Sequence, residues 1–184
     1  MAETSYKKWI LGLVLLLLVG GAVLVLTGLP RRGGEREPLV PAAPAEGFAA
    51  KERNLREQIR NSPERAELYA SLGDLYFEQQ DFARAADEYE EALKRNPQDA
   101  DTYNDLGLAL HYLGQEDKAV ETLRKGTDAD PSYQRIWLSL GYVLLSSGKT
   151  REARDALERA VELGPETTMG REARKFLQGL PPAQ

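Results

Sequence analysis

The residue types that could perform catalysis are scarce in this sequence. The 184-residue chain contains no cysteine and a single histidine, His111. Without cysteine, thiol catalysis, disulfides and thiolate zinc sites are excluded, and a lone histidine cannot build a metal site. No serine–aspartate arrangement accompanies His111, and the sequence has neither a phosphate-binding loop nor a dinucleotide fingerprint. We therefore expect no enzyme activity, no cofactor and no metal.

Carboxylates are the most abundant groups with chemical potential. Asp and Glu number 29 against 24 Lys and Arg, and the formal net charge is -5. No pattern indicates a desolvated carboxylate pair of the kind that acid–base catalysis uses. The acidity also argues against nucleic acid, which requires basic patches. Noncovalent recognition of another protein is the chemistry that remains.

One set of residues recurs three times, and each equivalent residue lies 34 positions further along the chain. Each copy has an aromatic residue, a Leu-Gly pair beginning three positions later, an alanine, a bulky residue four positions after it, and a closing proline. The copies are Tyr69, Leu72, Gly73, Ala85, Tyr89 and Pro97; Tyr103, Leu106, Gly107, Ala119, Leu123 and Pro131; and Trp137, Leu140, Gly141, Ala153, Leu157 and Pro165. The pattern resembles the tetratricopeptide repeat (TPR) family. This resemblance implies an all-α solenoid of three helix pairs.

The same residues predict how the helices form and pack. Small residues such as Gly73 allow a neighbouring helix to approach closely, and the apolar positions of each second helix form one buried stripe. Asp81 stands where it can cap a second helix. Gly114 and Gly148 can end first helices in the left-handed conformation, and the closing prolines stop the second helices.

Stacked repeats need caps at both ends, and the sequence predicts one on each side. The predicted organisation is an N-terminal tail (1–8), a transmembrane helix (9–29), a Pro/Gly-rich linker (30–46), a TPR domain (47–179) and a tail (180–184). Within the TPR domain we expect a cap helix at 47–61, repeats at 66–99, 100–133 and 134–167, and a cap helix at 166–179.

The first helices of a TPR stack line a concave groove, where partners bind. Helical spacing selects the groove positions, which give an acidic rim and an apolar, aromatic floor. The predicted protein-binding groove comprises Asp74, Phe77, Asp101, Asn104, Asp105, Leu108, His111, Tyr112, Arg135, Leu138, Tyr142 and Leu145. A partner segment with apolar anchors and some basic residues would suit this surface. The alternative is that several of these side chains pack against neighbouring helices.

Some TPR proteins hold the C-terminal carboxylate of a chaperone with a clamp of Lys, Asn and Arg. The corresponding positions here are Ala70, Asp74, Asn104, Leu108, Arg135 and Ser139. Only Asn104 keeps a clamp residue type, and Asp74 would repel a carboxylate. The resemblance therefore does not extend to that activity.

Residues 9–29 form an uncharged apolar run flanked by Lys7, Lys8, Arg31 and Arg32. As a helix the run would be about 31 Å long, which matches the hydrocarbon core of a bilayer. A cleaved secretory signal is the alternative, although its apolar core would be shorter. We expect a single-pass protein of a bacterial inner membrane, with the periplasmic side favoured over the cytoplasmic side for the repeats.

These inferences combine into one functional hypothesis with two alternatives. The chain is expected to be a membrane-anchored scaffold that binds a protein or peptide in the groove and helps to assemble a membrane or envelope complex. The alternatives are a self-associating structural protein, which leaves a homo-oligomer open, and a non-catalytic accessory subunit of a membrane enzyme or cytochrome c maturation complex.

Overall fold

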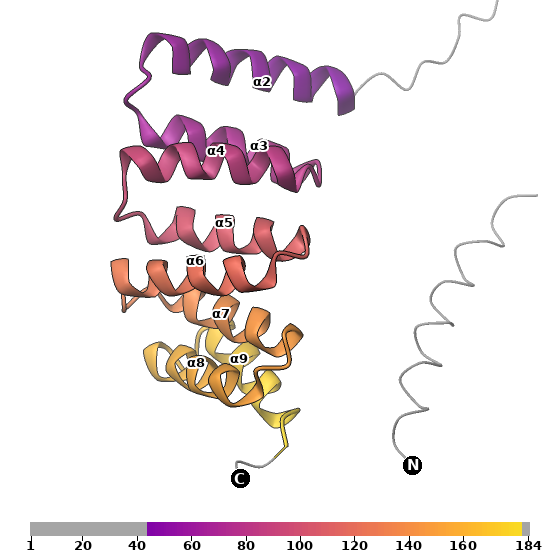
Figure 1. The fold of residues 1–184 in the computed structure, drawn as a ribbon, viewed down its shortest axis with the longest axis vertical. Helices are drawn as coiled ribbons and strands as arrows, with labels where there is room; N and C mark the ends of the chain where they lie inside the picture. The colour runs from indigo at the N-terminus through magenta and orange to yellow at the C-terminus, as the bar shows by residue number, and fades with distance from the viewer. Residues whose placement is uncertain (1–43, 182–184) are drawn as a thin grey trace, which may run out of the picture. The chain divides into compact units, whose positions relative to one another are not determined.

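The computed structural model describes residues 44–181, and this range contains eight α-helices. The helices are α2 (Pro44–Asn61), α3 (Ala66–Glu78), α4 (Phe82–Arg95), α5 (Ala100–Tyr112), α6 (Glu116–Ala129), α7 (Gln134–Ser146), α8 (Thr150–Leu163) and α9 (Thr168–Gln178). All of them belong to one compact unit, Ala42–Gln184. Figure 1 shows them stacked in chain order from α2 to α9.

The helices form antiparallel pairs that repeat at the spacing of the sequence pattern. The first helices α3, α5 and α7 begin at 66, 100 and 134, and the second helices α4, α6 and α8 begin at 82, 116 and 150. Each first helix packs against its own second helix, and each second helix also packs against the next first helix. The predicted all-α TPR solenoid is therefore confirmed for the described residues.

Glycine is required where the two helices of a pair cross. A Cβ atom added at Gly73 would lie 2.6 Å from the ring of Tyr89, and one at Gly107 would lie 2.5 Å from Cγ of Leu123. The third pair repeats this contact between Gly141 and Leu157 at 2.6 Å. The predicted close approach is thus confirmed in all three pairs, and the bulky partner fills the space that the glycine leaves.

The turn within each pair uses a left-handed residue, as predicted for two of the three repeats. Gly114 and Gly148 have φ angles of 72° and 73°. The equivalent residue of the first repeat is Gln80, with φ of 60°. Asp81 follows and accepts a hydrogen bond from the backbone N–H of Arg84, which confirms the predicted cap.

The two end helices attach to the stack by different means. Helix α2 packs Leu55 and Ile59 against the core, and its Glu52 carboxylate accepts a 2.6 Å hydrogen bond from the Tyr76 hydroxyl. It begins at Pro44, three residues before the predicted start of the cap. Proline is tolerated at this position because the first residues of a helix have no partner for their N–H groups. Helix α9 begins after the capping residue Thr167 and buries Ala173 completely.

The predicted localisation at a bacterial inner membrane is wrong on the helices that the structure describes. Within residues 44–181 no helix has both the length and the apolar character that crossing a bilayer requires. Helices α3 to α9 would each reach only about 17–21 Å of the roughly 30 Å hydrocarbon core, and α2 carries charged residues along its length. The predicted tail, span and most of the linker (1–43) lie outside the described residues.

Candidate functional site

The predicted groove residues lie on α3, α5 and α7. Helix α5 contacts both α3 and α7 directly, so the sides of these helices that turn away from their second helices form one surface. We call this surface the first-helix face. It carries a row of aromatic side chains, an acidic cluster and the edge of a pocket.

The aromatic row crosses the stack from the first repeat to the C-terminal cap. Its neighbouring ring centroids lie 4.7–6.2 Å apart, the separation at which aromatic pairs attract each other. The row consists of Phe82, Phe77, Tyr112, His111, Tyr142 and Phe176. Phe82 and Phe176 were not among the predicted site residues, because they lie outside the first helices of the three repeats.

Tyr112 is the accessible member of this row. It is 52% exposed, and within residues 47–181 the other exposed large hydrophobic residue is Leu113, at 37%. Its ring stacks on Phe82 at 4.7 Å. The ring is thus held in place by its neighbours while half of its surface faces solvent.

His111 is placed differently from the expected open groove position. Its side chain is only 11% exposed, and Nδ1 lies 2.8 Å from Oε2 of Glu116. The ring lies between Tyr112 and Tyr142. His111 therefore supports the aromatic row rather than presenting a free imidazole.

The apolar floor predicted for the third repeat is partly covered by the chain itself. Leu138 and Leu145 pack into a cluster with residues of α9, and Tyr142 lies 6.2 Å from Phe176. Helix α9 packs against α7 and α8 as the first helix of a further repeat would. This part of the prediction is corrected, because a cap that continues the stack must cover the surface of the last pair.

The acidic rim gathers between α3, α5 and α7. Arg135 donates a 3.1 Å hydrogen bond to Asp101, and the Tyr133 hydroxyl also donates to this carboxylate. Asp74 accepts a 2.8 Å hydrogen bond from the hydroxyl of the buried Tyr89. Asp105 accepts a 3.0 Å hydrogen bond from the side-chain amide of Asn104.

Among the acids of this cluster, Asp105 has the largest shift in pKa. Burial, together with the nearby charges of Asp101 and Asp74, raises the pKa of Asp105 to about 6. The hydrogen bond from Asn104 and the charge of Arg135 oppose this rise. Burial also raises the pKa of Asp74, while the hydrogen bond from Tyr89 lowers it. Asp74 keeps an exposed side chain, so solvent screens its interactions more than those of Asp105.

Asn104 was predicted to be exposed in the groove, and the structure differs from this prediction. It is completely buried, and its Oδ1 atom has no hydrogen-bond partner among the described residues. Helical spacing predicted that Asn104 lies on the exposed side of α5, but in the folded stack it is buried. Leu108, one turn further along α5, is half-buried against the core.

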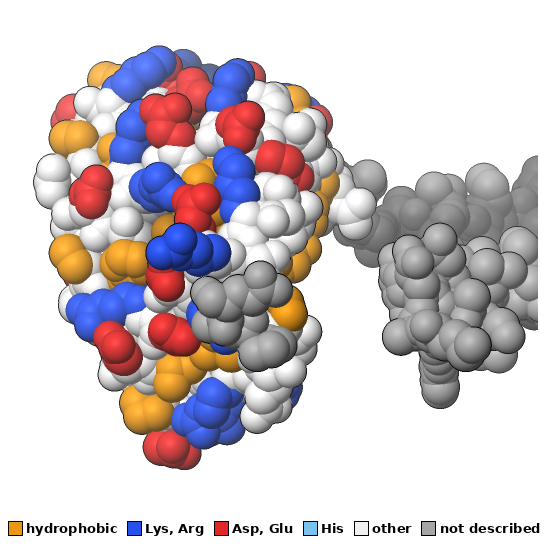
Figure 2. Space-filling view, turned by 60° about the horizontal axis from the view of Figure 1, so that its bottom comes forward, with side chains coloured by type: hydrophobic (Ala, Val, Ile, Leu, Met, Phe, Trp, Pro, Cys, Tyr) orange, Lys and Arg blue, Asp and Glu red, His pale blue; other side chains and the backbone are white. Residues whose placement is uncertain are grey.

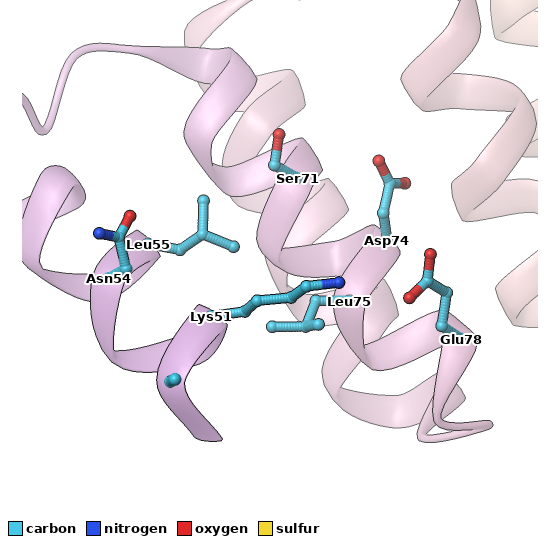
Figure 3. A pocket seen from close by; sticks show the side chains of 8 residues that line it. Lys51, Asn54, Leu55, Ser71, Asp74, Leu75 and Glu78 are labelled. Atoms are coloured by element: carbon cyan, nitrogen blue, oxygen red, sulfur yellow. The ribbon is translucent and has the colours of Figure 1, made fainter. Parts of the chain in front are cut away.

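A pocket of about 520 Å³ adjoins the acidic cluster at the N-terminal end of this face. It lies between α2 and α3, and Figure 3 shows Asp74 and Glu78 projecting from α3 on the side where Lys51 extends from α2. Leu55 and Leu75 form part of its apolar wall. Sequence reasoning missed the contribution of α2, since a lone cap helix gives no repeat-based register for its side chains.

Charges of both signs lie at the C-terminal end of the stack. Figure 2 shows basic and acidic side chains interspersed over the end of the stack that carries α8 and α9. A second pocket, of about 510 Å³, lies between α6, α7 and α8 and has both Arg124 and Glu152 in its lining. Neither feature forms the continuous basic surface that nucleic acid requires.

A family model described as tetratricopeptide repeat matches residues 52–100, 70–133 and 104–166. Together these matches cover more than half of the 184-residue chain. The chain therefore belongs to the tetratricopeptide repeat family, whose fold is a scaffold for protein–protein interaction.

Three comparisons with individual proteins agree with this family. A curated relative, the small glutamine-rich tetratricopeptide repeat-containing protein 2 of Mycosarcoma maydis, is 26% identical over 101 residues, which is 55% of this chain and 29% of that protein. The chain thus spans less than a third of this relative. The crystal structure of MamA matches with a TM-score of 0.62 at 19% identity, over 73% of this chain and 87% of that one. The TPR2B domain of yeast Sti1, in its pHsp70 complex, matches with a TM-score of 0.57 at 27% identity, over 62% of this chain and 91% of that one.

Proposed function

We propose that this chain is a non-catalytic interaction module that binds a segment of a partner protein on the first-helix face. In this role it holds the partner within a larger assembly. The observation that carries the proposal is Tyr112, a large aromatic side chain that is 52% exposed at the centre of a packed aromatic row.

An aromatic residue in this setting is a suitable anchor for a partner. Tyrosine buries a large area at a small conformational-entropy cost, and aromatic residues are enriched among the few that dominate binding energy. The stacking partners of Tyr112 fix its ring before binding, so little freedom is lost when a partner covers it. The TPR2B domain of yeast Sti1, which is similar to this chain, is known in a pHsp70 complex, and this supports binding of a partner by the same fold.

The partner differs in chemistry from a C-terminal carboxylate. The face carries Asp74, Asp101 and Asp105 close together, and only Arg135 provides a positive charge that pairs within this group. A carboxylate would meet repulsion here, whereas a segment with basic and apolar residues meets opposite charge and an exposed ring.

The test is capture of partners by the full chain and by variants at the exposed ring. Tyr112→Ala should reduce capture at least tenfold, whereas Tyr112→Phe, which keeps the ring, should retain it. Leu113→Ala is the matched control, because Leu113 is also exposed but lies beyond the end of α5. Circular dichroism verifies that each variant is folded. Equal capture by Tyr112→Ala and the parent chain would reject the first-helix face as the binding surface.

A further inference from the structure

We propose that Asp74 and Asp105 receive the lysine or arginine side chain of the bound segment, three residues away from an apolar side chain that covers Tyr112. This inference rests on the proposed function and specifies the partner that the same face selects. Three observations support it. They are the hydrogen-bond and ion-pair partners of the three acids, the buried carbonyl oxygen of Asn104 beside them, and the distance along α5 from Asp105 to Tyr112.

The three acids of the cluster are not equally satisfied. Asp101 is already neutralised by Arg135 and receives the Tyr133 hydroxyl. Asp74 and Asp105 receive only neutral donors, from Tyr89 and Asn104. No Lys or Arg of residues 47–181 lies within salt-bridge distance of either one. Two carboxylates on this face are therefore available to an external cation.

A second observation points independently to a missing donor at the same place. Asn104 is fully buried, and its Nδ2 atom donates to Asp105 at 3.0 Å, so its amide group lies at the cluster. The Oδ1 atom of this amide has no donor among the described residues. A buried acceptor without a donor is unfavourable. Because Asn104 is fully buried, an N–H group that enters beside Asp105 would satisfy Oδ1 after rotation of the Asn104 side chain.

The nature of these groups selects the ligand. The Asp74 and Asp105 carboxylates and the free Asn104 carbonyl are all acceptors, so they require a group with several donors and a positive charge. An ammonium offers three N–H donors and a guanidinium offers five. Among the residues that the structure describes, no three His, Cys, Asp or Glu side chains are arranged to hold a metal ion. A basic side chain therefore fits better than an inorganic cation.

The spacing to the aromatic row defines a motif. Asp105 and Tyr112 are seven residues apart on α5, which is about 10 Å along the helix axis. A segment in the polyproline II conformation covers about 9 Å in three residues, and side chains three residues apart point to the same side of it. A segment that lies along α5 would thus place a basic residue at Asp105 and an apolar residue at Tyr112 when two residues separate them.

The charged groups around the two acids determine how binding depends on pH. Asp105 faces Asp101 on its own helix, Asp74 of α3 and Arg135 of α7. Asp74 also faces Glu78 of α3 and shares a pocket with Lys51 of α2. Since a bound cation favours ionised carboxylates, binding should weaken as the pH falls from 7.5 to 5.

The test is an NMR titration of the ¹⁵N-labelled full chain with the peptide Ac-Gly-Lys-Ala-Ala-Phe-Gly-NH₂. A saturable shift of the Asn104 side-chain amide and the Asp105 backbone amide is expected. Norleucine in place of lysine should weaken binding at least tenfold, as should Asp74→Asn or Asp105→Asn in the protein. Glu158→Gln, an exposed change on α8, is the control that should leave binding unchanged.

Several results would overturn the inference. They are the absence of binding by the lysine peptide, equal binding by the norleucine peptide, full binding by both asparagine variants, and saturable binding of Ca²⁺ at the same amides. The proposed function is tested separately by capture. If Tyr112→Ala loses the natural partner while Asp74→Asn and Asp105→Asn retain it, the binding face stands and the cation receptor is rejected.

Discussion

At the scale of single residues, the first turn between paired helices departs from the other two. Within the described residues, Gln80 is the non-glycine residue with positive φ, at 60°, and its equivalents in the next repeats are Gly114 and Gly148. The left-handed conformation is strained for a residue that carries Cβ and is free of strain for glycine. Gln80 therefore stores strain that the later repeats avoid.

Gln80→Gly is expected to raise the free energy of unfolding by about 0.5–1 kcal/mol, because relief of strain exceeds the added flexibility of the unfolded chain. Urea unfolding followed by circular dichroism measures the change. The matched control is Gly114→Ala, which should lower stability, since the φ of 72° is retained while a Cβ is added. A Gln80→Gly variant no more stable than the parent would show that this turn is not strained.

Asp105 leads to a prediction about pH and stability. Its folded pKa of about 6 lies above the ordinary value of 3.8, so between these values the folded state binds more protons than the unfolded state. Stability is therefore lost as the pH rises through this window. Asp105→Asn should stabilise the chain at pH 7 by up to about 3 kcal/mol and should make little difference below about pH 4. Thermal unfolding of both proteins across pH 4–8 tests this, and an equal difference at every pH would contradict it.

The role of a residue could be predicted where it depends on the local backbone conformation. It could not be predicted where it depends on packing against residues distant in sequence. Gly114 and Asp81 behave as predicted, because a left-handed turn and a helix cap depend on local conformation. The packing of His111 against Tyr142 depends on a side chain 31 residues away in sequence, and the complete burial of Asn104 becomes visible only in the folded stack. Helical spacing alone does not contain that information.

At the scale of helices, the contact between α8 and α9 depends on a backbone approach. A Cβ atom at Gly170 would lie 2.0 Å from the carbonyl oxygen of Gly164. Backbone atoms cannot move aside as a flexible side chain can, so α9 must shift when this atom is added. The cap that covers the third repeat is thus held by a glycine outside the repeated pattern.

Gly170→Ala is expected to detach α9, with a loss of about 1–3 kcal/mol of stability. Hydrogen exchange should show faster exchange throughout α9 and little change in α3 and α4. Gly179→Ala is the control, since its nearest atom would be 3.4 Å away, at an ordinary contact distance. Unchanged protection of α9 in Gly170→Ala would mean that the added methyl group fits without movement of the helix.

The positions of the repeat helices along the chain were the most predictable feature of this structure. The repeat of 34 residues places α3 to α8 correctly because each position of the pattern has the same packing role in every copy. The end helices lack a second copy for comparison. For this reason the start of α2 at Pro44, and the covering of Leu138 and Leu145 by α9, were not predicted.

At the scale of the whole stack, the two ends are incomplete repeats of opposite type. Helix α2 stands in the place of a second helix, and α9 in the place of a first helix. Head-to-tail association would pair them across two molecules. However, residues 47–61 carry four basic and two acidic side chains, and α9 carries three basic and one acidic, so both ends are positive. Like charges oppose this contact.

Residues 44–184 are therefore expected to remain monomeric at low ionic strength. Sedimentation equilibrium at several concentrations measures this. Added salt should be needed before any association appears, because salt screens the repulsion between the ends. A concentration-dependent dimer in low salt would instead favour the alternative in which the repeats self-associate.

The central claim is that the first-helix face of this TPR stack is the surface that a partner covers. Replacement of Tyr112 by a photo-reactive phenylalanine in the full chain, followed by irradiation in its native cells and mass spectrometry, tests it most directly. The same probe at Glu158 on α8 is the control. We expect the probe at 112 to cross-link a discrete partner segment with a basic and an apolar residue, and the probe at 158 not to cross-link it. Cross-linking of the same partner from position 158 alone would contradict it.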